Sequence, residues 1–387
     1  MNVPFSILVK VALRTPRLFA SVARETLRSK SIKYLDHHFG RGRALLPPRY
    51  IDIKMTNRCN LRCKMCGQWG EQGTMHNASA DFIRSELELD ELRALVDDVA
   101  GFKPMFYLWG GEPLLYADLI PFLAYLQSRG LTAAINTNGV LLAEKAEGLV
   151  RHGVANLLIS VDGPAEIHDR VRGVPGTFDR VMGGVQKVME AREARGTANP
   201  YITFVTTVNT ENDTAFERVY DIAADVGVDF VGLQFGTFTT ECTGPAYENR
   251  MRTALGCEAT NWHGFLSYNS HLDIPAVQEQ VRRIRAASHP FGTYFIPDLA
   301  VEDIPTYYSS TRPMNGCRMC TVPWMRADLL PNGDVYPCID FPDYIVGNIR
   351  ETPLTELWNG ERYVQFRREL QQELFPICPR CQTLYEF

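Results

Sequence analysis

The 387-residue chain is long enough to bury a large core, and its 45% apolar and 22% charged content is typical of a globular protein. A net charge of −5 argues against a nucleic-acid partner, and no apolar run reaches the roughly 18 residues of a membrane span. The ten cysteines are too few for a disulfide scaffold. Eight of them fall in two groups, 59–66 and 317–381, as metal ligands do, so we expect a protein of the reducing cytoplasm.

The first segment, residues 1–48, is predicted to be a basic amphipathic helical arm, broken near Pro16. It carries nine Lys and Arg against two acidic residues. Basic charge beside an apolar stripe suits peripheral contact of residues 1–30 with a membrane surface. Packing of the same helices on the main domain is the alternative.

From residue 50, short β-rich runs alternate with segments of helical spacing. Strands are predicted at 50–55, 105–109, 132–137, 156–161, 201–207 and 229–235, and helices at 86–100, 117–129, 142–151, 177–195, 214–226 and 276–287. This alternation predicts an α/β fold in which a parallel sheet curls into a partial (β/α)6 TIM-like barrel over residues 49–290. Polar residues follow each strand, and we expect them to meet at the C-terminal strand ends, where barrels of this kind have their active face.

Two further segments complete the chain. Residues 236–275 are predicted to be a long irregular insertion that roofs the pocket, because loops of that length are usually functional. Residues 310–387 are predicted to be a separate small unit. It has a hairpin turning at Asn332-Gly333, a helix near 353–358 and a longer helix over 361–373.

The stretch "CNLRCKMC" brings Cys59, Cys63 and Cys66 together within eight residues. Three thiolates are one too few for a closed four-coordinate structural site. They suffice for three irons of a four-iron cluster, whose fourth iron then stays open to another ligand. A zinc site completed by His76 is the alternative.

This motif resembles the C-x3-C-x2-C signature of radical S-adenosylmethionine (SAM) enzymes, and the resemblance covers about residues 50–387. It implies a [4Fe-4S] cluster whose open iron binds SAM, and reductive cleavage of SAM to a 5′-deoxyadenosyl radical that abstracts a substrate hydrogen. It also implies an electron donor such as flavodoxin or ferredoxin.

The resemblance further implies contacts to SAM from the ends of strands two to five and from the "HDRVRG" segment. The residue before the third cysteine is usually aromatic in the family, and here it is a methionine, so the packing of the adenine is expected to differ. The residues implied are Gly110, Gly111, Glu112, Pro113, Asn138, Ser160, Asp162, Arg172, Val208, Asn209 and Met65.

The second cysteine group resembles the auxiliary-cluster module called SPASM, in its shortened twitch form, and "VGNIRETPLTELWNG" (346–360) resembles a stretch inside it. The resemblance implies one auxiliary [4Fe-4S] cluster held by Cys320, Cys338, Cys378 and Cys381, with Cys317 as an alternative first ligand. A structural zinc knuckle is the competing interpretation.

An auxiliary cluster closed by four cysteines suits electron transfer and hence a net two-electron oxidation. We therefore expect an oxidoreductase that dehydrogenates a hydroxyl-bearing small molecule or sugar-type intermediate, since the short spacing is similar to that of radical SAM alcohol dehydrogenases. The alternatives are a peptide-modifying enzyme, a radical epimerase with a loop cysteine as hydrogen donor, and a non-enzymatic metal-binding scaffold. The insertion offers Cys257, His263 and Glu241 as catalytic candidates.

Overall fold

A computed structural model describes residues 35–36, 39–266, 271–314 and 316–385. The predicted helices of residues 1–30 and their contact with a membrane lie outside these residues. In the part of the chain that is described, no helix combines the length and apolar character needed to cross a membrane.

A ten-stranded sheet organises the molecule, in the order β10-β9-β8-β1-β2-β3-β4-β5-β6-β7. All six predicted strands are confirmed, and neighbours among them pair in parallel. A further parallel strand, β7, which the sequence analysis missed, pairs with the sixth. The bounds are β1 (Tyr50–Lys54), β2 (Met105–Trp109), β3 (Ala133–Thr137), β4 (Asn156–Ser160), β5 (Tyr201–Thr207), β6 (Phe230–Gln234) and β7 (Gly292–Ile296).

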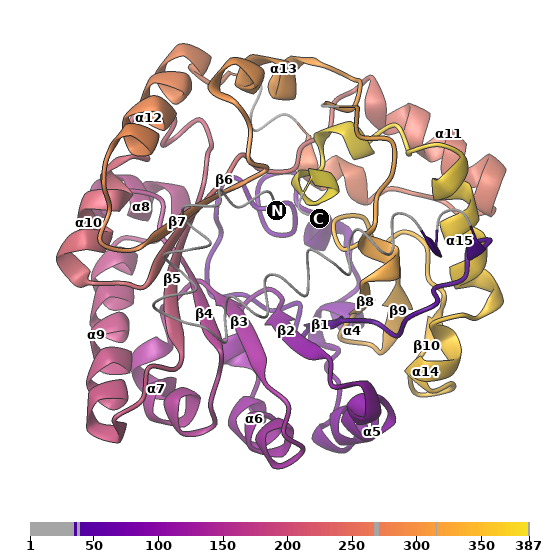
Figure 1. The fold of residues 1–387 in the computed structure, drawn as a ribbon, viewed down its shortest axis with the longest axis horizontal. Coiled ribbons are helices and arrows are strands. Elements are labelled where there is room, and N and C mark those ends of the chain that lie inside the picture. The colour runs from indigo at the N-terminus through magenta and orange to yellow at the C-terminus, as the bar shows by residue number, and fades with distance from the viewer. Residues whose placement is uncertain (1–34, 37–38, 267–270, 315, 386–387) are drawn as a thin grey trace.

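The helices between these strands cover the outer side of the curved sheet (Figure 1). The six predicted helices are confirmed as α5 (Leu89–Val99), α6 (Leu119–Ser128), α7 (Leu142–Arg151), α9 (Thr177–Arg195), α10 (Arg218–Val226) and α12 (Ile274–Ala286). Shorter helices are α4 (Ala80–Arg84), α8 (Ala165–Arg172) and α13 (Ile304–Ser309). Local chemistry sets their ends: a capping box of Glu88 and Glu91 begins α5.

The two faces of the sheet differ in burial, and this difference positions the site. Along β2, Phe106 and Leu108 are fully buried, and Phe106 packs edge-on against Phe122 of α6. Tyr107 and Trp109, which point the other way, are half-buried. The same alternation recurs along β4. The helix-covered face therefore forms the core, and the concave face remains partly accessible.

The insertion 236–275 is not irregular, contrary to the prediction. It contains α11 (Thr243–Leu255) and a 3-10 turn over Asn261–Phe265. The buried apolar stripe of α11 consists of Tyr247, Met251 and Leu255, one side chain per turn. The helix was not predicted because this stripe is narrow and begins beside Gly244 and Pro245, two residues of low helix propensity.

The C-terminal segment is not separate from the barrel, which also corrects the prediction. The expected hairpin is present as β8 (Arg326–Leu329) and β9 (Asp334–Tyr336), followed by β10 (Gly347–Asn348), α14 (Leu354–Leu357) and α15 (Glu361–Gln372). However, β8 pairs in parallel with β1 and so extends the same sheet. A buried ion pair between Arg326 and Asp52 links the two strands.

Candidate active site

The three-cysteine loop begins directly after β1, at the C-terminal end of the strands. The Sγ of Cys59 accepts the Leu61 N–H at 3.4 Å, and the Sγ of Cys66 accepts the N–H groups of Gln68 and Trp69, each at 3.4 Å. Burial raises the pKa of the Cys59 thiol to about 12, and the nearby Cys63 and Cys66 add to the rise. A bound cation would favour the thiolate form of these side chains, a condition that an iron cluster meets.

His76, the candidate fourth ligand of a zinc site, turns away from that role. Its Nε2 lies 2.8 Å from the Gly70 carbonyl oxygen, to which it donates a hydrogen bond. In the described ranges, no three or more His, Cys, Asp or Glu side chains are arranged to hold a metal ion as they stand. The cysteines are therefore assigned as ligands from their shared loop and spacing.

The "GGEP" loop after β2 lies against the start of the cysteine loop. The N–H of Gly111 donates to the Thr56 carbonyl at 2.8 Å, and the N–H of Glu112 donates to the Arg58 carbonyl at 2.8 Å. A Cβ on Gly111 would overlap the Arg58 carbonyl oxygen, so glycine is required here. Pro113 begins the short turn that follows.

Glu112 is fully buried and bridges the ends of β2 and β3. Its carboxylate accepts hydrogen bonds from the Leu114 N–H at 3.0 Å, the Thr137 hydroxyl at 2.6 Å and the Asn138 N–H at 2.8 Å. Burial nevertheless raises the pKa of Glu112 to about 7. Three neutral donors thus leave the charge incompletely stabilised, and an ammonium group such as that of SAM suits this position.

Asn138 and Ser160 follow the next two strands. The Asn138 Nδ2 donates to the Asn60 Oδ1 at 2.8 Å and approaches the Cys59 Sγ at 3.9 Å, so this residue lies beside the cysteine loop. Ser160 ends β4 and is half-buried on the concave face.

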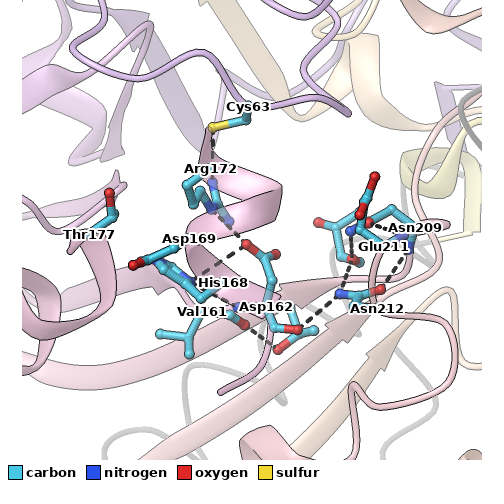
Figure 2. Close-up of polar contacts among 12 residues, drawn as sticks. Cys63, Val161, Asp162, His168, Asp169, Arg172, Thr177, Asn209, Glu211 and Asn212 are labelled. Carbon is cyan, nitrogen blue, oxygen red and sulfur yellow. Dashed lines mark hydrogen bonds and ion pairs between the residues drawn. The ribbon is translucent and has the colours of Figure 1, made fainter. Parts of the chain in front are cut away.

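A buried group formed by Asp162, His168 and Arg172 reaches the cysteine loop from the end of β4 (Figure 2). The Nε of Arg172 donates to the Asp162 Oδ2 at 2.6 Å, and its Nη1 donates to the Cys63 Sγ at 3.7 Å. Burial, and then the charge of Arg172, lower the pKa of His168 to about 3, so its imidazole is neutral. Arg172 therefore contacts Cys63, a proposed iron ligand, directly. Its contact with SAM stays a prediction.

The residues after β5 contact mainly their own loop. Val208 is fully buried. The Asn209 Nδ2 donates to the Thr207 carbonyl at 2.9 Å, and its Oδ1 accepts the Glu211 N–H at 3.0 Å. The amide of Asn209 therefore shapes the turn. Met65 is half-buried in the cysteine loop.

The 3-10 turn of the insertion packs closely on the cysteine loop. A Cβ on Gly264 would overlap the Gly67 carbonyl oxygen, so the two backbones are in contact there. The three catalytic candidates have separate surroundings. His263 is exposed, stacks on Trp262 at 3.8 Å between ring centroids, and has its Nε2 3.7 Å from the Glu248 Oε1. Cys257 is half-buried, and burial raises its pKa to about 11. Glu241 is exposed.

The second cysteine group lines one cavity, whose wall also includes α15 and the segments that precede β8 and follow β9. Cys320, Cys338, Cys378 and Cys381 all contribute to its wall. Cys317 is not among the lining residues, and its Sγ lies 3.6 Å from the Met319 carbonyl oxygen. The structure thus favours Cys320 over Cys317 as the fourth ligand.

Two functional candidates escaped the sequence analysis. Asp340 lies in the auxiliary cavity, where its Oδ2 accepts a hydrogen bond from the Cys381 thiol at 2.9 Å. Lys54 ends β1 with 4% of its surface exposed and has its Nζ 5.8 Å from the centre of the Trp109 ring. Burial lowers the pKa of Lys54 to about 8. Neither residue belongs to a motif, and only the strand alternation around Lys54 could have placed it on the concave face.

Comparison with known proteins agrees with this geometry. The family model described as the radical SAM superfamily matches residues 53–223, and that of the iron–sulfur cluster-binding SPASM domain matches residues 320–382. The chain belongs to the radical SAM superfamily. As a radical SAM enzyme with a SPASM domain, it uses a [4Fe-4S] cluster with SAM and carries auxiliary iron–sulfur chemistry in its C-terminal segment.

Relatives of this radical SAM protein have diverse names. The AdoMet-dependent heme synthase of Methanosarcina barkeri is 28% identical over 342 residues, which are 87% of this chain and 88% of the relative. The PqqA peptide cyclase of Gluconobacter oxydans is 24% identical, over 81% of this chain and 77% of the relative. The crystal structure of Streptococcus suis SuiB bound to S-adenosylmethionine superposes with a TM-score of 0.57 at 14% identity, covering 83% of this chain and 68% of that one. That likeness shows a shared fold.

Proposed function

We propose that the protein is an oxidoreductase that converts an alcohol of a small molecule to a carbonyl. The observation that carries the proposal is the presence of two cysteine sites on one continuous sheet. The three-cysteine loop follows β1, and the four-cysteine cavity is lined by the segments that flank the β8–β9 hairpin, whose strand β8 pairs with β1. One site suits radical formation, and the other suits electron transfer.

Seven cysteines would hold the two clusters. Cys59, Cys63 and Cys66 would hold the first, and Cys320, Cys338, Cys378 and Cys381 the second. When bound, SAM and the first cluster supply a radical that removes one hydrogen atom, and the auxiliary cluster supplies an acceptor for one electron. Loss of the hydroxyl proton completes the oxidation.

The concave face supports a substrate with hydroxyl groups. Four of its half-buried side chains can donate and accept hydrogen bonds, namely Asn136, Ser160, Thr207 and Gln234. Lys54 adds a cation on the same face. No carboxylate of the described residues pairs with its ammonium group, so an anionic group on the substrate would suit it.

The test uses anaerobically reconstituted protein with about eight irons per chain. It is incubated with SAM, dithionite and a panel of cyclitols and sugar alcohols deuterated at the hydroxyl-bearing carbon. We expect one class of alcohol to yield deuterated 5′-deoxyadenosine and a carbonyl product that has lost one deuterium and one hydroxyl proton. A product in which hydrogen has replaced the deuterium with no further loss of hydrogen, or turnover of no alcohol in the panel by protein that still cleaves SAM, would count against the proposal.

A second candidate is oxidation of a carboxylate-bearing tetrapyrrole or a peptide, favoured by the heme synthase and the peptide cyclase among the relatives. Lys54 would then meet a carboxylate. Substituting Lys54→Met separates the candidates when an active substrate is known: a rise in KM for an acidic substrate, with little change for a neutral one, identifies the anionic group.

A further inference from the structure

Arg172 lies between a carboxylate and a sulfur at the edge of the cysteine loop. Its Nε donates to the Asp162 Oδ2 at 2.6 Å, and its Nη1 donates to the Cys63 Sγ at 3.7 Å. Figure 2 shows the guanidinium group between these two partners. Asp162 is fully buried and Arg172 is 7% exposed, so water screens their charges little.

The backbone holds Arg172 against the loop independently of its side chain. Arg172 is the last residue of α8, and Gly173 ends the helix with a φ of +75°. The Lys64 N–H donates to the Val171 carbonyl at 3.1 Å. A Cβ on Gly173 would lie 2.9 Å from the Arg62 carbonyl oxygen, so the end of α8 is closely packed on the segment that contains Cys63.

The backbone of Asp162 is fixed in turn by residues of α8 and of the loop after β5. Its backbone N–H donates to the His168 Nδ1 at 3.3 Å, and its carbonyl oxygen accepts the Asn212 Nδ2 at 3.1 Å. The preceding carbonyl, of Val161, accepts the Thr206 hydroxyl at 2.7 Å. The backbone of Asp162 is therefore held in one place, and its carboxylate accepts the hydrogen bond from the guanidinium of Arg172.

We propose that Arg172 is a positioning residue for the first cluster, oriented by Asp162, and that its hydrogen bond to Cys63 raises the reduction potential of that cluster. The proposal rests on the cluster assignment of the proposed function and deepens it. Hydrogen bonds to ligand sulfurs and nearby net charge both set such potentials. Arg172 raises the potential through its positive charge and its N–H···S bond, and Asp162 lowers it through its negative charge.

This arrangement predicts shifts of opposite sign for two nearly isosteric substitutions. Arg172→Gln removes the positive charge and should lower the potential. Asp162→Asn removes the negative charge but keeps an oxygen that can accept from the Arg172 Nε, and it should raise the potential. Arg170→Gln is the matched control on the same helix, because Arg170 is half-exposed and pairs with Glu211 at 2.7 Å.

The experiment is a redox titration of anaerobically reconstituted full-length protein, followed by electron paramagnetic resonance. The signal that changes when SAM is added identifies the first cluster, and its midpoint is then measured without SAM. We expect each substitution to change the ratio of reduced to oxidised cluster about tenfold at fixed potential, which is 59 mV for one electron. Arg170→Gln should leave the midpoint unchanged.

The proposal would be overturned if Arg172→Gln and Asp162→Asn had equal midpoint potentials, or if both shifted in the same direction from the wild type at normal iron content. If Arg172→Gln binds less iron, Arg172→Lys decides the question. Normal iron content in Arg172→Lys, with a midpoint potential closer to that of the wild type, supports the role. Low iron content in Arg172→Lys, together with no rise of the midpoint potential in Asp162→Asn, overturns it. Wild-type protein without any SAM-sensitive signal would instead refute the cluster assignment.

Discussion

Substitution of Glu112 by Gln tests whether this buried carboxylate binds the amino group of SAM. The side chain keeps its size and one acceptor oxygen but can no longer carry a negative charge. Glu112 has three hydrogen-bond donors from the protein and no cationic partner within ion-pair distance among the described residues. A bound ammonium group would provide that partner.

The expected magnitude follows from the energy of a hydrogen bond to a charged group, about 1.5–3 kcal/mol. At roughly 1.4 kcal/mol per tenfold change, Glu112→Gln should raise the Kd for SAM about 10- to 150-fold. The pH dependence has a defined sign. Because burial raises the pKa of Glu112 to about 7 in the free protein, SAM must displace a proton below that pH. The affinity should fall about tenfold per pH unit below 7 and level off above it.

Equilibrium binding of SAM to the oxidised cluster-containing protein, measured from pH 5.5 to 8.5, provides the assay. The variant should bind weakly with no inflection near pH 7. Thr137→Val removes the donor at 2.6 Å that favours the ionised form, so it should move the inflection to higher pH. Glu147→Gln, on the exposed side of α7, is the control. An unchanged Kd for Glu112→Gln, or an inflection that survives in this variant, would refute the reasoning.

Three further predictions concern the loop, the auxiliary cavity and the buried histidine. Gly111→Ala should impair folding and cluster loading, because the added Cβ overlaps a backbone carbonyl. Gly183→Ala, whose added Cβ has no atom within 4 Å, should instead stabilise α9 by about 0.5–1 kcal/mol. Thermal unfolding of the two variants tests both expectations. Cys320→Ser should lose about four irons per chain and Cys317→Ser none. Equal losses would show that the choice of Cys320 over Cys317 as ligand, based on the residues that line the cavity, is wrong. His168 has a pKa lowered to about 3, so below pH 6.5 the unfolded chain binds a proton that the folded chain does not. The free energy of unfolding should therefore fall by up to about 1.4 kcal/mol per pH unit below that pH. Chemical denaturation should show a shallower slope for His168→Asn.

Local sequence patterns predicted most of the barrel because each element has its own apolar spacing. The short apolar and aromatic run of β2, for example, indicates a strand within five residues. Pairing between distant segments has no such signal. Nothing near residue 326 indicates that β8 pairs with β1, some 275 positions earlier, and α11 has too narrow an apolar stripe to be recognised.

The site shows the same division. The cysteines were predicted because their spacing is local and their chemistry is restrictive. Lys54 and Asp340 were missed because their significance comes from burial and from neighbours in space. Asn209 shows what its place after a strand could not reveal: both ends of its amide are engaged within its own turn, while its contact with SAM stays a prediction.

The pairing of β8 with β1 has a consequence for how this protein can be divided. Removing the chain from residue 310 onward would strip one flank of the strand that leads into the cysteine loop, leaving its backbone N–H and C=O groups bare. Such a truncated barrel would invite other chains to add to that edge and aggregate. The two halves therefore have to be expressed, engineered and exchanged between relatives as one unit.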